Sequence, residues 1–105
     1  MRIVINNIAA SQGGALTILR DFYNFVLNDL EAQNHEWIFL LSDHYIKETE
    51  NIKVKIIKEV KKSWLTRLKF DYFTGKKIVE SLKADLVISF QNTIIRGINC
   101  PQFLY

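Results

Sequence analysis

Apolar residues form two kinds of pattern along the chain. Residues 2–8, 36–42 and 84–90 each contain an uninterrupted apolar run, at 3–5, 37–41 and 86–88, which is typical of strands covered on both faces. Residues 52–57 alternate apolar residues with lysine, which predicts a strand with one solvent-facing side at a sheet edge. Residues 101–105 begin another apolar run. The pattern therefore predicts four strands and the start of a fifth.

Between these runs, apolar residues recur at intervals of three and four, the spacing of one helix face. The first such stretch begins at Ala15 and predicts a helix that ends near residues 33–34. Its apolar stripe comprises Leu16, Leu19, Tyr23, Val26 and Leu30. The second stretch predicts a helix over residues 63–83, with Gly75 as a candidate break. Its stripe comprises Leu65, Leu68, Tyr72, Val79 and Leu82.

The order strand–helix–strand–strand–helix–strand indicates an α/β fold, Rossmann-like, with a mostly parallel sheet and helices on both faces. Right-handed crossovers give the strand order 3-2-1-4-5. The connection before the third strand is shorter than the dozen residues that a parallel crossover usually takes. An antiparallel third strand is therefore an alternative.

This order places a topological switch between the first and fourth strands, where open α/β sheets bind ligands. The loops 9–14 and 91–99 would face each other there. Gly13 and Gly14 precede the first helix, where backbone N–H groups can approach an anion such as a diphosphate. They fit neither the GxGxxG nor the Walker A pattern. A tight turn that only starts the helix explains them equally well.

Polar residues follow the apolar runs at this predicted edge. Gln91, Asn92 and Thr93 carry amide and hydroxyl groups that could bind sugar hydroxyls. Capping of the nearby backbone is the ordinary alternative for such residues, and the predicted crevice favours binding. Asn6 and Asn7 have the same two interpretations, with capping slightly favoured.

Composition narrows the class of protein. With 105 residues, 49% hydrophobic and 24% charged, the chain has room for one packed domain. No apolar run approaches the ~20 residues of a membrane span, and the N-terminus lacks the apolar segment of a signal peptide. Cys100 is the only cysteine, so a cytoplasmic protein without internal disulfides is expected. His35 and His44 lack partners at metal-ligand spacing and are interpreted as solvated loop residues, and no metal or cofactor is expected.

Charge is distributed unevenly. Residues 1–52 hold 3 basic and 7 acidic side chains, whereas residues 53–83 hold 10 basic and 3 acidic ones. This basic block predicts a patch that binds an anionic membrane surface. The patch comprises Lys58, Lys61, Lys62, Trp64, Arg67 and Lys69. A solvated helix face is the ordinary alternative, and nucleic acid is disfavoured because no nucleic-acid-binding motif accompanies the charge.

Two segments carry a resemblance to a known family. Residues 2–7, followed by Gly13-Gly14-Ala15 at the start of an amphipathic helix, resemble the start of family 4 glycosyltransferases, which have the GT-B fold. Residues 84–92 are similar to the fourth strand of that family. The resemblance implies that the acceptor binds in this N-terminal domain and the nucleotide-sugar in a second, C-terminal domain. It also implies that Gly13 and Gly14 lie near the donor diphosphate.

The resemblance thus implies a truncated GT-B N-terminal domain, the acceptor-side half of a hexosyltransferase. The complete enzyme would move a glycosyl group from a nucleotide-sugar substrate to a hydroxyl acceptor in bacterial surface polysaccharide or glycolipid synthesis. Its acceptor would be a sugar or lipid-linked sugar, bound through Asn7, Gln91, Asn92 and Thr93, at the inner face of the membrane. Without its C-terminal domain the chain is expected to be inactive. A non-catalytic Rossmann-like binding module and a basic nucleic-acid-binding domain are the alternatives.

Overall fold

The computed structural model describes residues 1–8, 13–57, 75–90, 95 and 97–104. Five strands, two α-helices and one short 3-10 helix are found among these residues. In chain order they are β1 (Arg2–Asn6), α1 (Gly14–Asn28), η1 (Ala32–Asn34), β2 (Glu36–Leu41), β3 (Ile52–Ile56), α3 (Gly75–Leu82), β4 (Leu86–Ser89) and β5 (Gln102–Leu104).

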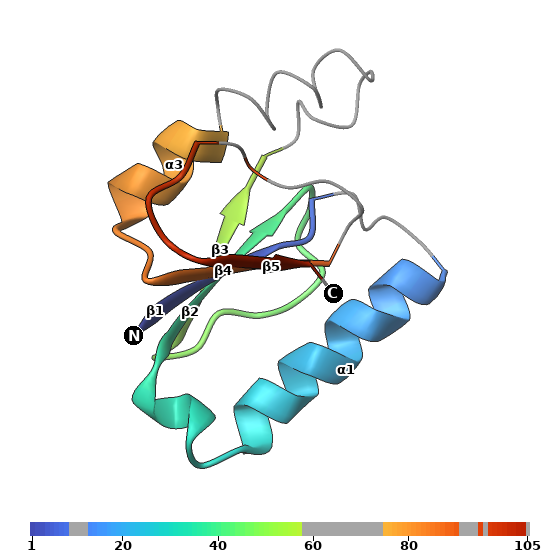
Figure 1. Cartoon of the computed structure of the whole chain (residues 1–105). Coiled ribbons are helices and arrows are strands. Elements are labelled where there is room, and N and C mark those ends of the chain that lie inside the picture. Colours follow the sequence, from blue (N-terminus) through green and yellow to red (C-terminus); the bar gives the residue numbers. More distant parts are fainter. Residues whose placement is uncertain (9–12, 58–74, 91–94, 96, 105) are drawn as a thin grey trace.

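The five strands form one sheet in which every pair of neighbours is parallel. Their order is β3-β2-β1-β4-β5, as the handedness of the crossovers predicts. Helices α1 and α3 lie on opposite sides of this sheet (Figure 1). The Rossmann-like α/β fold expected from the sequence is therefore confirmed.

Side chains of the central strands alternate between two cores. On the side of α1, Ile5 and Phe39 are fully buried and pack in one cluster with Leu19 of the helix. On the side of α3, Val4 and Val87 are fully buried in a second cluster that includes Val79 of that helix. Because both faces of β1 and β2 are covered, these strands consist of continuous apolar residues.

The third strand is parallel to β2, so the antiparallel alternative is wrong. Residues 42–51 connect the two strands without a helix. Tyr45 and Ile46 pack against the core on the side of α1, and the Tyr23 hydroxyl donates a hydrogen bond to the Lys47 carbonyl at 2.8 Å. Apolar residues of an extended loop thus cover the sheet where a crossover helix normally would. The prediction that β3 has one solvent-facing side is confirmed, because Lys53 and Lys55 are exposed.

Helix α1 ends at Asn28, several residues before the expected end near residue 34. The Asp29 backbone is extended, and its carboxylate accepts a hydrogen bond from the Ala32 N–H at 3.0 Å. Asp and Asn side chains compete in this way with the helical backbone. Leu30 consequently lies beyond the helix and is 80% exposed, so its assignment to the apolar stripe is wrong.

Helix α3 occupies the last part of the second predicted helix. Val79 is buried, and Ile78 and Leu82 pack partly buried beside it. The rest of that prediction, residues 63–74 and the break proposed at Gly75, lies outside the described residues. Neither of the two described α-helices has the length and apolar content that crossing a membrane requires.

Candidate functional site

The four buried polar residues found in the described part of the chain all lie at the carboxyl edge of the sheet. Asn6 and Asn7 end β1, Ser42 follows β2, and Ser89 ends β4. In register, Asn6 lies opposite Leu40 on one side and Ser89 on the other. Because β1 and β4 flank the point where strand order reverses, this cluster occupies the topological switch of the sheet.

The two asparagine side chains are buried without full hydrogen bonding. Asn6 has no exposed surface, and neither Nδ2 nor Oδ1 has a hydrogen-bond partner among the described residues. The Nδ2 atom of Asn7 is unpartnered in the same sense. Their backbones are paired, since Asn7 N–H donates to Leu40 O at 3.1 Å and Phe90 N–H donates to Asn6 O at 3.0 Å. The unsatisfied capacity therefore belongs to the carboxamides.

The N-terminus of α1 lies in the same loop region, directly after β1 in the chain. Gly13 precedes the helix with φ 64° and ψ −138°, a conformation that strongly favours glycine. The first turn contains no acidic residue and receives no side-chain cap from the described residues. The first N–H groups of a helix have no partner within it, and such groups favour the binding of an anion.

The backbone conformation that explains glycine at position 13 does not explain glycine at position 14. Its φ lies outside the left-handed region, and a Cβ atom built there would meet no described atom within 4 Å. Both glycines are exposed. Neither backbone strain nor crowding therefore requires glycine at position 14, whereas backbone strain does at position 13.

On the other side of the switch point, Ile95 is held in place by Gln102 of β5. The Ile95 N–H donates to Gln102 Oε1 at 2.9 Å, and Gln102 Nε2 donates back to Ile95 O at 2.7 Å. Ile95 is buried in the core on the side of α3. This pair fixes one point of the loop between β4 and β5 against the sheet.

Of the residues predicted for the site, Gly13, Gly14 and Asn7 lie in or next to the loop at this edge. Gln91, Asn92 and Thr93 fall outside the described residues. So do all members of the basic patch, Lys58, Lys61, Lys62, Trp64, Arg67 and Lys69. Ser42 and Ser89 were not singled out from the sequence, although each is a polar residue that closes an apolar strand, as Asn6 does.

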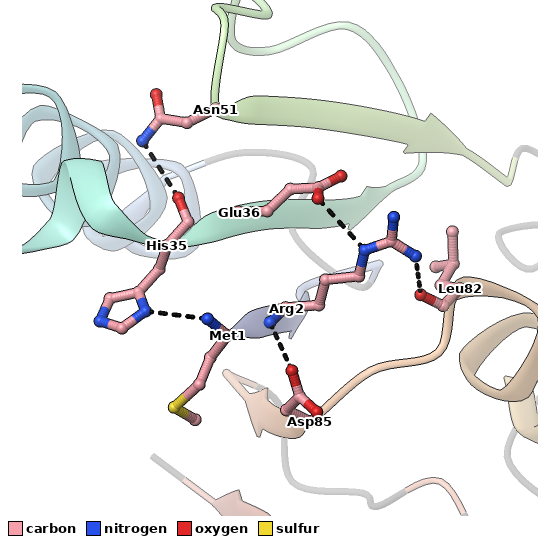
Figure 2. A network of polar contacts seen from close by, with 7 residues as sticks. All are labelled: Met1, Arg2, His35, Glu36, Asn51, Leu82 and Asp85. Carbon is pink, nitrogen blue, oxygen red and sulfur yellow. Dashed lines mark hydrogen bonds and ion pairs between the residues drawn. The ribbon is translucent and has the colours of Figure 1, made fainter.

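The opposite, amino edge of the sheet carries a second polar network (Figure 2). Arg2 N–H donates to Asp85 Oδ2 at 2.8 Å, and the Arg2 guanidinium contacts both Glu36 Oε2 at 3.1 Å and Leu82 O at 2.9 Å. In the last contact, the Arg2 guanidinium donates to a carbonyl at the C-terminus of α3, where carbonyls have no partner within the helix. Arg2 thus joins β1, β2, α3 and the start of β4.

His35 also belongs to this amino-edge network, and it is a half-buried residue of the bend between η1 and β2. Its Nδ1 lies 3.2 Å from the Met1 amino group, and its carbonyl accepts a hydrogen bond from Asn51 Nδ2 at 3.3 Å. His44 is exposed.

Within the described residues, no three His, Cys, Asp or Glu side chains are grouped so as to hold a metal ion. Comparison with models of protein families, with characterised proteins and with solved structures gives no match for this chain.

Proposed function

We propose that the carboxyl edge binds a nucleotide-sugar or its sugar-containing acceptor, and that the chain is the acceptor-side domain of a glycosyltransferase. The observation that carries the proposal is the gathering of buried, unpaired carboxamides at the topological switch, next to the glycines that begin α1. A ligand with both an anionic group and neutral hydroxyls matches these two features. In the reaction, a glycosyl group passes from a nucleotide-sugar to a hydroxyl acceptor.

The first turn of α1 supports binding of the anionic part. Oriented N–H groups at a helix N-terminus favour negative charge, and no acidic side chain of that turn opposes it. The open space at Gly14 lets a phosphate approach the backbone more closely than a side chain would permit.

The proposal includes a second domain that completes the donor site, so the 105-residue protein alone binds ligands without transferring sugar. It also includes a sugar or lipid-linked sugar acceptor at the cytoplasmic face of a membrane. Turnover of a nucleotide-sugar by the purified 105-residue protein would contradict this division between two domains.

The direct test is an NMR titration of the ¹⁵N-labelled protein with uridine diphosphate and with inorganic pyrophosphate. We expect the backbone amide signals of Gly13 and Gly14 to shift with both probes, since both present phosphate oxygens. In the Gly14→Val variant the shifts should be lost while the unfolding midpoint in urea changes little, because the new side chain enters open space. Gly13 and Gly14 signals that stay unchanged at millimolar probe would overturn the proposal.

A further inference from the structure

The Asn6 side chain is the polar group least explained by the fold. A carboxamide has two N–H donors and an oxygen that accepts two hydrogen bonds. In Asn6 both ends are buried and unpaired among the described residues. A buried polar group left unsatisfied destabilises the folded state, whereas an apolar residue of similar shape would not.

The surroundings of Asn6 favour an apolar residue. By the alternation of β1 it lies on the side of α3, together with Val4, and its register neighbour Leu40 belongs to the apolar core on that side. Ile8, two positions further along the chain, is buried in the same core. The register neighbour on the other side, Ser89, is buried and polar, but the Asn6 carboxamide makes no hydrogen bond to it or to any other described residue.

We propose that Asn6 is a sugar-binding residue whose carboxamide exchanges hydrogen bonds with neutral hydroxyl groups of the ligand. The inference rests on the proposed function and extends it from the anionic to the uncharged part of the ligand. Hydroxyls both donate and accept, as a carboxamide does, whereas an ionised phosphate only accepts and would be repelled by Oδ1. The chemistry of Asn6 therefore favours a polyol over an anion.

This assignment gives the site two parts on opposite sides of the sheet. The first turn of α1 lies on one side, and Asn6 lies on the side of α3, with Asn7 between them in the chain. A bound ligand would cross the carboxyl end of β1. Because Asn6 is fully buried, the neighbouring atoms must move before a sugar can reach it. This movement breaks no hydrogen bond between the Asn6 side chain and a described residue.

The first test is the stability of Asn6→Leu, with Asn51→Leu as the matched control. Asn51 is the opposite case, because its Nδ2 donates to His35 O and its Oδ1 accepts from the Thr49 hydroxyl. In urea, Asn6→Leu should lower the unfolding equilibrium constant roughly tenfold, the equivalent of about 1.4 kcal/mol, and Asn51→Leu should raise it. An increase for Asn6→Leu would show that Asn6 has a partner in the unliganded fold, a trapped water included, and would overturn the inference.

The second test separates this inference from the proposed function. The side-chain NH₂ signal of Asn6, assigned by its loss in Asn6→Leu, is followed during titration with methyl glycosides of glucose, galactose and mannose, and separately with pyrophosphate. We expect at least one glycoside to shift Asn6, and pyrophosphate to shift Gly13 and Gly14 but not Asn6. If pyrophosphate shifts Gly14 but no glycoside shifts Asn6, the inference fails and the proposed function stands. If a glycoside shifts Asn6 but pyrophosphate leaves Gly14 unchanged, the inference stands and the anion site fails.

Discussion

Polar side chains at the two edges of the sheet differ in both their burial and their hydrogen bonding. At the amino edge, Arg2 and Glu36 are both more than 40% exposed and pair with each other, and Asp85 pairs with the Arg2 backbone. At the carboxyl edge, Asn6 and Asn7 are buried, and their carboxamides keep unused donors and acceptors among the described residues. An unpaired polar group costs little free energy at an exposed position and much more at a buried one. The exposed groups of the amino edge are nevertheless the ones that are hydrogen-bonded, and the buried carboxamides are the ones that are not.

This difference separates groups that stabilise the fold from groups that do not. The amino-edge bonds connect segments far apart in the sequence and hold the ends of β1, β2, α3 and β4 together. The carboxyl-edge amides lie where parallel sheets bind ligands. Local rules of good packing are most often broken at functional sites, which is why the unpaired amides are more informative than the bonded network.

The largest expected effect concerns Trp37, near the amino end of β2. It is 6% exposed, and its Nε1 donates to the Ala32 carbonyl at 2.9 Å. Trp37→Ala should reduce the free energy of unfolding by about 3–5 kcal/mol in a urea titration, chiefly because it removes a large buried ring. The Ala32 carbonyl keeps its hydrogen bond from the His35 N–H at 3.1 Å, so the lost indole bond is the smaller part of the effect. Phe103→Ala, at a residue 59% exposed on β5, is the control and should change stability by less than about 0.5 kcal/mol. Equal losses would contradict the stabilising role of the amino end.

The next effect contrasts the two glycines at the carboxyl edge. Gly13→Ala should destabilise by about 1–3 kcal/mol, because φ 64° with ψ −138° is strained for any residue with a Cβ. Gly14→Ala should instead stabilise by about 0.5–1 kcal/mol, since alanine favours the helix and its Cβ meets open space. Thermal unfolding of both variants measures the difference. If Gly14→Ala destabilises as much as Gly13→Ala, packing explains Gly14 and its role as an approach for ligand loses support.

A smaller effect is expected for Arg2. Arg2→Met keeps the aliphatic part of the side chain but loses the contacts to Glu36 and to Leu82 O. Because this side chain is 44% exposed, water partly replaces those contacts, and we expect a loss of about 1 kcal/mol. Glu36→Gln, which keeps an acceptor but removes the charge, should lose less, and the gap between Glu36→Gln and the wild type should narrow in 1 M salt. An Arg2→Met protein as stable as the wild type would show that the guanidinium contacts of Arg2 contribute nothing to folding.

Most of the fold follows from the sequence because burial on both faces produces continuous apolar strands, and crossover handedness then fixes their order. The direction of β3 does not follow from it, because that direction depends on Tyr45 and Ile46 covering the sheet in place of a helix. The end of α1 also depends on a specific contact, the bond between the Asp29 carboxylate and the Ala32 N–H. Periodicity alone carries no information about either.

The sequence predicted where the candidate site lies, but it did not predict which of its side chains are unpaired. Gly13, Gly14 and Asn7 were placed at the carboxyl edge by the strand order alone. The state of Asn6 was not, because whether a carboxamide is paired depends on every neighbour in three dimensions. Its two possible roles, capping and binding, have the same sequence pattern, and only the unpaired atoms favour binding.

The smallest expected effect concerns the charge of Asp85 at the amino edge. Partial burial, and secondly the negative charge of Asp85, raise the pKa of the Cys100 thiol above its ordinary value. A raised pKa in the folded state means that the protonated thiol favours folding at neutral pH, and that this contribution falls as pH rises through the folded-state pKa. Asp85→Asn should lower the pKa of Cys100 only in part, since burial is the larger cause. The amide oxygen that this substitution introduces can still accept the Arg2 N–H, so the fold should persist.

The measurement is the rate of alkylation of Cys100 by iodoacetamide between pH 7 and 10.5, with the urea-unfolded chain as reference. The midpoint of the rate should be highest in the wild type, lower in Asp85→Asn and lowest in urea. Equal midpoints in the wild type and in Asp85→Asn would show that the charge of Asp85 does not reach Cys100, and a wild-type midpoint at or below that of the unfolded chain would contradict the raised pKa.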